Sequence, residues 1–191
     1  MHTRQFAQLI SRVAHPINII CLTLLIINSA AQGNALLGLI DTTILLLGLL
    51  PAILYLVTTR HTPTANRKYV AICLLLLGVA ATIGIYAAGT RSVTQIRSLA
   101  VGIIGGIGIT LIHRYWNISF HAATSMGCVA LLIPISPPIA SCIGILAVLA
   151  GLARLPIHEH TLFQVLAGWL YGFGVTAMLL ALSTNLVDIS R

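Results

Sequence analysis

The feature that most constrains this chain is the run from Ile17 to Thr59, in which Asp41 is the only charged residue. A transmembrane helix needs about 20 predominantly apolar residues, so this run is too long for one helix and long enough for two. Over the whole chain 58% of residues are hydrophobic and 7% are charged, whereas a soluble domain carries about 25% charged residues. The sequence therefore predicts an integral membrane protein.

Polar segments and prolines divide the apolar sequence into helices, because a lipid-exposed backbone must satisfy its hydrogen bonds within the segment. We predict an all-α fold, a polytopic transmembrane helical bundle of about six to seven spans, in one domain over 16–185. The predicted spans are 16–32, 35–57, 69–88, 99–112, 118–135, 139–153 and 161–182. Gln32-Gly33-Asn34 is the expected first turn. Ahead of the bundle, residues 1–15 carry apolar side chains at helical spacing, which predicts an interfacial amphipathic helix.

The charge balance excludes several functions. The chain has ten basic residues and only three acidic ones, Asp41, Glu159 and Asp188. Paired-carboxylate glycosidases, calcium cages and acid-rich magnesium-diphosphate sites need grouped carboxylates. A nucleic-acid-binding face needs clustered exposed cations, whereas most cations here stand singly between apolar runs. We therefore expect the lipid bilayer, with its anionic headgroups, and no nucleic acid as partner.

The topology brings distant polar segments to one side of the membrane. With seven spans, the N-terminus and the segments 58–68, 113–121 and 154–160 share a face, which holds seven of the ten basic residues. The positive-inside rule would make this face cytoplasmic. Without the four arginines that are candidate ligands, each side keeps three cations, so the sequence leaves the orientation open.

Three of these segments carry residues suited to phosphate chemistry. They are Arg60-x6-Arg67, Ser119-Phe120-His121 and Arg154-x5-His160-x3-Gln164. In this pattern the chain resembles the type 2 phosphatidic acid phosphatase superfamily, the membrane lipid phosphatases related to vanadium haloperoxidases. That family shows K-x6-R-P, P-S-G-H and S-R-x5-H-x3-D. The resemblance covers residues 60–172, and it departs most at Gln164, where the family has an aspartate, and in the two spans between Arg67 and Ser119.

The resemblance implies a role for each residue. His160 would attack phosphorus and form a phosphohistidine, His121 would protonate the leaving alkoxide, and Gln164 would orient His160. The phosphate would be bound by Arg154, Ser119, Arg67 and Arg60, without a metal or other cofactor. Arginine and histidine suit these roles, because a guanidinium offers a fork of donors to phosphate and imidazole titrates near neutrality. The implied function is a metal-independent phosphoric ester hydrolase in the plasma membrane, acting on a lipid or isoprenoid phosphate or diphosphate. The sequence does not indicate an oligomeric state.

Other interpretations stay open. An amide at Gln164 adds no negative charge beside a cationic imidazole, which favours a catalytically inactive relative that binds anionic lipid or acts as a membrane scaffold. Arg154 would then be an interfacial cation, and His158-Glu159-His160 could be a metal cluster. Asp41 either pairs with an arginine or ends a helix. A small transporter is disfavoured, since the chain has no internal repeat. The glycines at 102, 105, 106 and 108 are expected to allow close helix packing.

Overall fold

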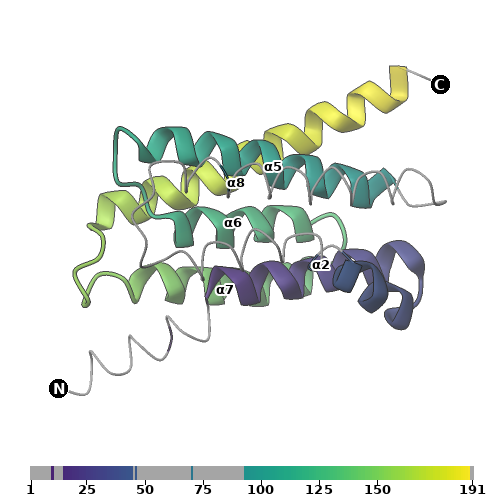
Figure 1. Cartoon of the computed structure of the whole chain (residues 1–191), viewed down its shortest axis with the longest axis horizontal. Helices are drawn as coiled ribbons and strands as arrows, with labels where there is room; N and C mark the ends of the chain where they lie inside the picture. Colours follow the sequence, from purple (N-terminus) through teal and green to yellow (C-terminus); the bar gives the residue numbers. More distant parts are fainter. Residues whose placement is uncertain (1–9, 11–14, 45, 47–69, 71–92, 190–191) are drawn as a thin grey trace. The chain divides into compact units, whose positions relative to one another are not determined.

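The computed structural model describes residues 10, 15–44, 46, 70 and 93–189. Every regular element in this part of the chain is a helix, so the all-α prediction is confirmed there. The helices are α2 (Pro16–Gln32), α5 (Val93–His113), α6 (Phe120–Leu132), α7 (Pro137–Leu152) and α8 (Leu162–Ile189), with a further one at Ala35–Ile44 (Figure 1). The predicted span 69–88, most of the predicted helix at 1–15, and Arg60 and Arg67 lie outside the described residues.

The chain divides into two compact units, one made of Met1–Ile27 with Arg97–Arg191 and the other of Asn28–Ile96. Helices α2 and α5 each contribute residues to both units. The prediction of a single transmembrane domain over 16–185 stays a prediction.

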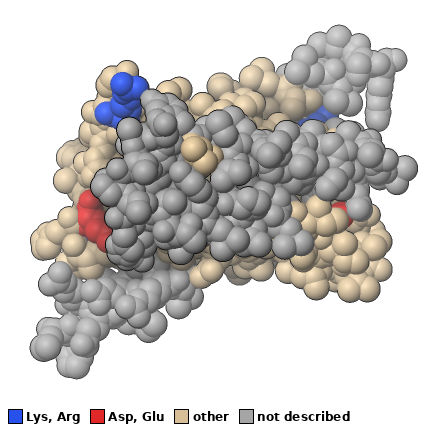
Figure 2. Space-filling view, in the orientation of Figure 1, with Lys and Arg blue, Asp and Glu red and all other residues tan. Residues whose placement is uncertain are grey.

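Two helices in the described part of the chain are long and apolar enough to cross a membrane, Thr94–His113 and Leu162–Ser183. Only 22% of each of these segments is buried, whereas the core helix of a soluble protein is mostly buried. Large apolar side chains such as Leu170, 76% exposed, face outward instead. Most of the described surface drawn in Figure 2 is uncharged. The other apolar helices in the described residues have 10–17 residues, so two candidate spans are found there and the prediction of six to seven spans stays unconfirmed.

Helix boundaries follow the sequence closely where proline or glycine sets them. Gly33 adopts φ +61° after α2, in the expected turn, and a glycine reaches this left-handed region without the penalty of a Cβ. Asn34 then accepts the amide of Leu36 at 2.8 Å and begins the next helix. The two largest differences are that α5 begins at Val93 rather than at residue 99 and that α8 continues to Ile189 rather than ending at residue 182, whereas α6 and α7 begin and end within three residues of their predicted bounds. Neither extension contains a proline or glycine that would stop a helix.

Helices α6 and α8 run parallel and touch backbone to backbone. A Cβ on Gly168 would lie 2.6 Å from the carbonyl oxygen of Ser119, and a Cβ on Gly172 would overlap the backbone of Ala123. One turn further, a Cβ on Gly127 would approach the Thr176 hydroxyl at 3.1 Å. Small residues thus recur every four positions on both helices, the spacing that lets helices in lipid approach closely.

The glycines of α5 contribute less to packing than expected. Gly102, Gly105 and Gly106 meet nothing within 4 Å where a Cβ would stand, as far as the described atoms show. Gly108 does face Tyr171, whose hydroxyl donates to the Gly105 carbonyl at 2.8 Å. Close packing in this unit is therefore concentrated on α6 and α8.

Helix α7 runs back along α6 and closes the core of the first unit (Figure 1). The core is formed by small and branched side chains from α2, α6 and α7: Ile19, Ile27, Cys128, Val129, Leu132, Ala140, Ile143, Ala147 and Ala150. Because α7 is antiparallel to α6, its last residues return to the end where α6 begins, and the loop 153–161 then starts α8 at that same end. The arrangement gathers the starts of α6 and α8 and the end of α7.

A buried polar cluster lies in the second unit. The Asp41 carboxylate accepts amide hydrogens from Gln32 at 2.8 Å and from Gln95 at 2.9 Å. Gln95 also donates to Asn28, whose own amide donates to Thr42. Asp41 does not end a helix as one interpretation held, because the helix continues to Ile44. The early start of α5 is explained as well, since it carries Gln95 into this cluster.

Candidate functional site

Arg154 is a buried cation at the end of α7. Only 6% of the residue is exposed, and one of its terminal nitrogens, Nη1, donates to the Glu159 carboxylate. Its Nε is buried and has no acceptor among the described residues. A buried guanidinium donor without an acceptor costs about 1–3 kcal/mol or more, so Arg154 has an unmet capacity to bind an anion.

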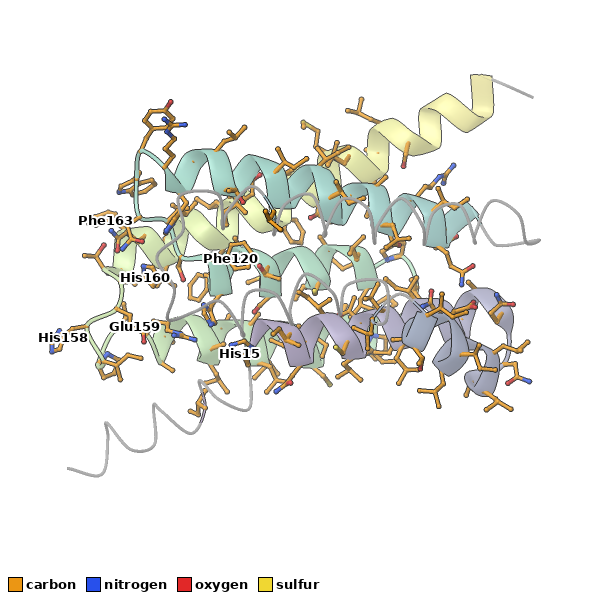
Figure 3. The ribbon with its side chains drawn as sticks, viewed as in Figure 1. His15, Phe120, His158, Glu159, His160 and Phe163 are labelled. Atoms are coloured by element: carbon orange, nitrogen blue, oxygen red, sulfur yellow. The ribbon has the colours of Figure 1, made fainter. Side chains whose placement is uncertain are left out.

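The loop after α7 holds Glu159 against Arg154. The amide of Glu159 donates to the carbonyl of Arg154 at 3.3 Å, and His158 adopts φ +59°, a left-handed conformation that is uncommon outside glycine. Figure 3 shows His158 at the tip of this loop. The Glu159 side chain is 49% exposed, against 8% for that of Arg154. Because the Glu159 carboxylate is the more exposed partner, an incoming anion can replace it on the Arg154 guanidinium.

His121 lies close to these charges. It is in the first turn of α6, near enough to Arg154, Glu159 and His160 for their charges to act on it. The structure thus places His121, Arg154 and His160, three residues of the phosphatase-like motifs, in one region. Arg154 carries a positive charge at every physiological pH, so it is the residue here that would attract a bound anion.

Ser119 joins the starts of α6 and α8. Its backbone amide donates to the carbonyl of Gln164 at 3.2 Å, and its side chain is fully buried. The Ser119 hydroxyl oxygen caps α6 by accepting the amide of Ala122 at 3.4 Å. This cap uses the oxygen as an acceptor, so the hydroxyl hydrogen can still be donated to a ligand.

His15 also belongs to this region, although the sequence gave no sign of it. Its ring meets that of His121 edge to face, with centroids 5.4 Å apart and an interplanar angle of 88°. It precedes α2, where its Nδ1 accepts the amide of Ile17 at 3.4 Å. The His-Pro pair before an apolar run does signal a helix start, but only the fold brings that start to His121.

Gln164 caps α8. Its side-chain oxygen accepts the amide of Thr161 at 2.9 Å, and the Thr161 hydroxyl accepts the amide of Gln164 at 3.4 Å. This is a capping box, in which two residues three apart satisfy each other's free amides at a helix start. The oxygen that would orient His160 is therefore used by the helix. The Nδ1 of His160 is buried and has no partner among the described residues.

Several features make this end of the unit a candidate anion site with an aromatic rim. Parallel helices α6 and α8 both begin here, and helix N-termini carry partial positive charge. Tyr115, Trp116, Phe120 and Phe163 are all exposed around the same end, where tyrosine and tryptophan favour the boundary between lipid and water. Figure 3 shows Phe163, His160 and Glu159 together there. Arg114 is exposed and fits an interfacial cation rather than a ligand.

Two further findings bear on the site. Among the residues that the structure describes, no group of three or more His, Cys, Asp or Glu is arranged to hold a metal, so a His158-Glu159-His160 metal cluster gains no support there. No protein-family model, curated protein or solved structure matches the chain. The resemblance to lipid phosphatases thus depends on the motif residues and on where the fold places them.

Proposed function

We propose that the chain is a multi-pass protein of the plasma membrane, with six to seven helical spans, that hydrolyses the phosphate or diphosphate of a lipid or isoprenoid alcohol without a metal. The observation that carries this proposal is Arg154, buried with an unpaired Nε beside His121 and His160. Phosphoryl transfer needs positioning and charge stabilisation more than other chemistry, and these residues supply both.

In the proposed reaction the substrate phosphate replaces the Glu159 carboxylate on Arg154, and Ser119 donates its hydroxyl hydrogen to a phosphate oxygen. His160 attacks through Nε2, since its Nδ1 is buried. As the N–P bond forms, the P–O bond to the lipid breaks, and the alkoxide takes a proton from His121. A water molecule then gives a proton back to His121 and attacks phosphorus, which releases orthophosphate and restores His160.

A covalent intermediate is the specific test of this proposal. Purified protein in detergent is mixed with a ³²P-labelled lipid phosphate and quenched in alkali, which preserves phosphohistidine. We expect label on the unmodified protein and on His158→Gln, a matched control two residues away at the exposed loop tip. Label is expected to be absent from His160→Gln. Turnover with equal labelling of His160→Gln would show that another residue is the nucleophile.

A second candidate function is binding of an anionic lipid without turnover. The observation that favours it is the capping box, because it uses the Gln164 oxygen at the place where the family has a carboxylate for the nucleophile. Losing such an orienting carboxylate costs about 10⁴ in kcat in serine proteases. Saturable binding of phosphatidate that requires Arg154, with neither label nor released phosphate, would establish this function in place of the first.

A further inference from the structure

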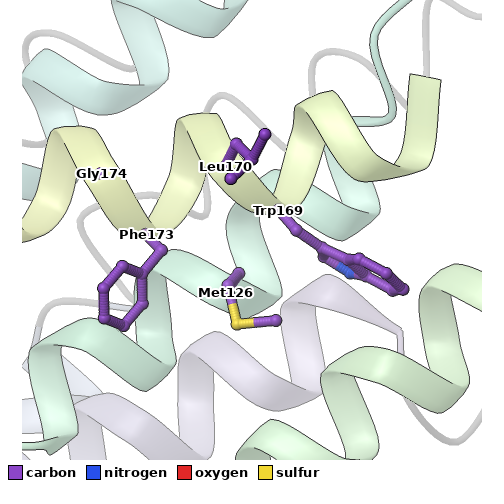
Figure 4. Close-up of a pocket in the computed structure, with 5 residues that line it drawn as sticks. All are labelled: Met126, Trp169, Leu170, Phe173 and Gly174. Atoms are coloured by element: carbon purple, nitrogen blue, oxygen red, sulfur yellow. The ribbon is translucent and has the colours of Figure 1, made fainter. Parts of the chain in front are cut away.

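An apolar groove runs between α6 and α8, outside the polar site (Figure 4). It has a volume of about 300 Å³ and is lined by Met126, Trp169, Leu170, Phe173 and Gly174. Leu170 and Phe173 are exposed, so the groove opens toward the surroundings of the helix pair. A volume of about 300 Å³ is at the lower end for a small-molecule pocket, and its lining suits an aliphatic chain.

Trp169 links the lining of the groove to α7. A Cβ on Gly151 would lie 2.6 Å from Cζ2 and 2.9 Å from Nε1 of Trp169, so the indole packs directly on Gly151. The carbonyl of Gly151 accepts the amide of Arg154 at 3.1 Å. Trp169, a lining residue of the groove, therefore lies about one turn of α7 from Arg154.

Distances along α8 fit an amphipathic ligand. With a rise of about 1.5 Å per residue, Trp169 lies about 8 Å and Gly174 about 15 Å along the helix from Gln164. A phosphate at Arg154 would thus have its ester linkage near Trp169 and its chain beside Phe173. The Nε1 of Trp169 is buried and has no acceptor among the described residues, so a ligand oxygen that reached it would satisfy this donor.

We propose that this groove holds the hydrocarbon chain of the lipid whose phosphate binds at Arg154. The inference rests on the proposed phosphate site but not on turnover, so it applies to the phosphatase and to the lipid-binding protein alike. Bilayer hydrocarbon is as apolar as the groove, so the groove contributes position rather than affinity. It places the first part of the chain along α8 and thereby aligns the phosphate with His160.

Tryptophan fluorescence can test this placement directly. The chain has two tryptophans, and Trp116→Phe leaves Trp169 as the only one. The full-length protein is placed in vesicles containing equal mole fractions of either phosphatidate or phosphatidylcholine with brominated acyl chains, since bromine quenches indole on contact. We expect stronger quenching by the brominated phosphatidate, and loss of that excess in Arg154→Gln. Equal quenching by the two lipids would mean that bulk lipid occupies the groove, which overturns the inference.

A second variant blocks the groove itself. A Cβ on Gly174 meets nothing within 4 Å, so Gly174→Leu fills the groove without a clash among the described residues. Gly102→Leu on α5 is the matched control, because its Cβ position is equally open. The excess quenching should be lost in Gly174→Leu and kept in Gly102→Leu, and excess quenching that persists in Gly174→Leu would contradict the placement. Excess quenching without phosphate release would refute the phosphatase alone, whereas release without excess quenching would refute the groove alone.

Discussion

Replacing Gly172 by alanine tests the helix contact on which the whole site depends. The new Cβ would overlap the carbonyl oxygen of Ala123 and stand 2.7 Å from its carbonyl carbon and 2.9 Å from its Cα. Ordinary contacts at such positions are 3.4–4 Å, and the obstructing atoms are backbone, which cannot rotate away. Helices α6 and α8 must therefore separate by roughly 1 Å, a change of the kind that costs about 1–3 kcal/mol when a packed core is overfilled.

The matched control is Gly174→Ala on the same helix, where the added Cβ meets nothing within 4 Å. Both substitutions gain the same helix propensity, about 1 kcal/mol, so the difference between them isolates the clash. We expect Gly172→Ala to unfold at a lower SDS fraction than Gly174→Ala, by an amount equivalent to about 1–3 kcal/mol. If Gly172→Ala is as stable as Gly174→Ala, the close contact of α6 with α8 is wrong.

The same variant should also impair activity. Ser119 caps α6 and His121 lies in its first turn, whereas His160 lies two residues before α8, so separating the helices moves the two histidines apart. A displacement of about 1 Å can cost about 10²-fold in rate. Turnover by folded Gly172→Ala should therefore fall far more than its stability alone would explain, and unchanged turnover would place the reacting groups elsewhere.

Three further substitutions probe individual contacts. Glu159→Gln removes the anion that competes for Arg154. It should tighten orthophosphate binding, measured by calorimetry, up to about fivefold, since half-exposed ion pairs contribute up to about 1 kcal/mol. Weaker binding would make Glu159 part of the ligand site. Thr161→Ala should lower the free energy of unfolding by about 1 kcal/mol through loss of the α8 cap, and no change in SDS titration would argue against the capping box. Gln95→Ala removes a donor to buried Asp41 and should cost about 1–3 kcal/mol in the same titration, whereas full stability would show that the cluster in the second unit is dispensable.

Much of the helical framework could be predicted from local sequence. Helix α2 has the bounds that the apolar run between Pro16 and Gly33 predicted, whereas α7 begins at the proline pair 137–138, two residues before its predicted start at 139. These boundaries depend on residues that lack a backbone donor or tolerate positive φ, so they need no knowledge of the fold. The start of α5 was missed because Gln95 looks like a loop residue until a buried partner for it is known.

The site was only partly accessible from the sequence. The motif comparison selected His121, Arg154 and His160, which the fold brings together, but the capping role of Gln164 was missed. The local pattern Thr-x-x-Gln before an apolar run carries that signal, and the comparison with the family's aspartate obscured it. The participation of His15 depends on a contact between residues far apart in the chain, and no local pattern reports such a contact.

Phosphate release under metal chelation tests the central claim most directly. The unmodified protein, His160→Gln and the control His158→Gln are assayed in detergent with EDTA against phosphatidate, lysophosphatidate and polyprenyl phosphates and diphosphates. We expect release of orthophosphate from at least one of these by the unmodified protein and by His158→Gln, and loss of that release in His160→Gln. If the folded protein released no orthophosphate from any of these substrates, or if His160→Gln released as much as the unmodified protein, the histidine-based phosphatase would be contradicted.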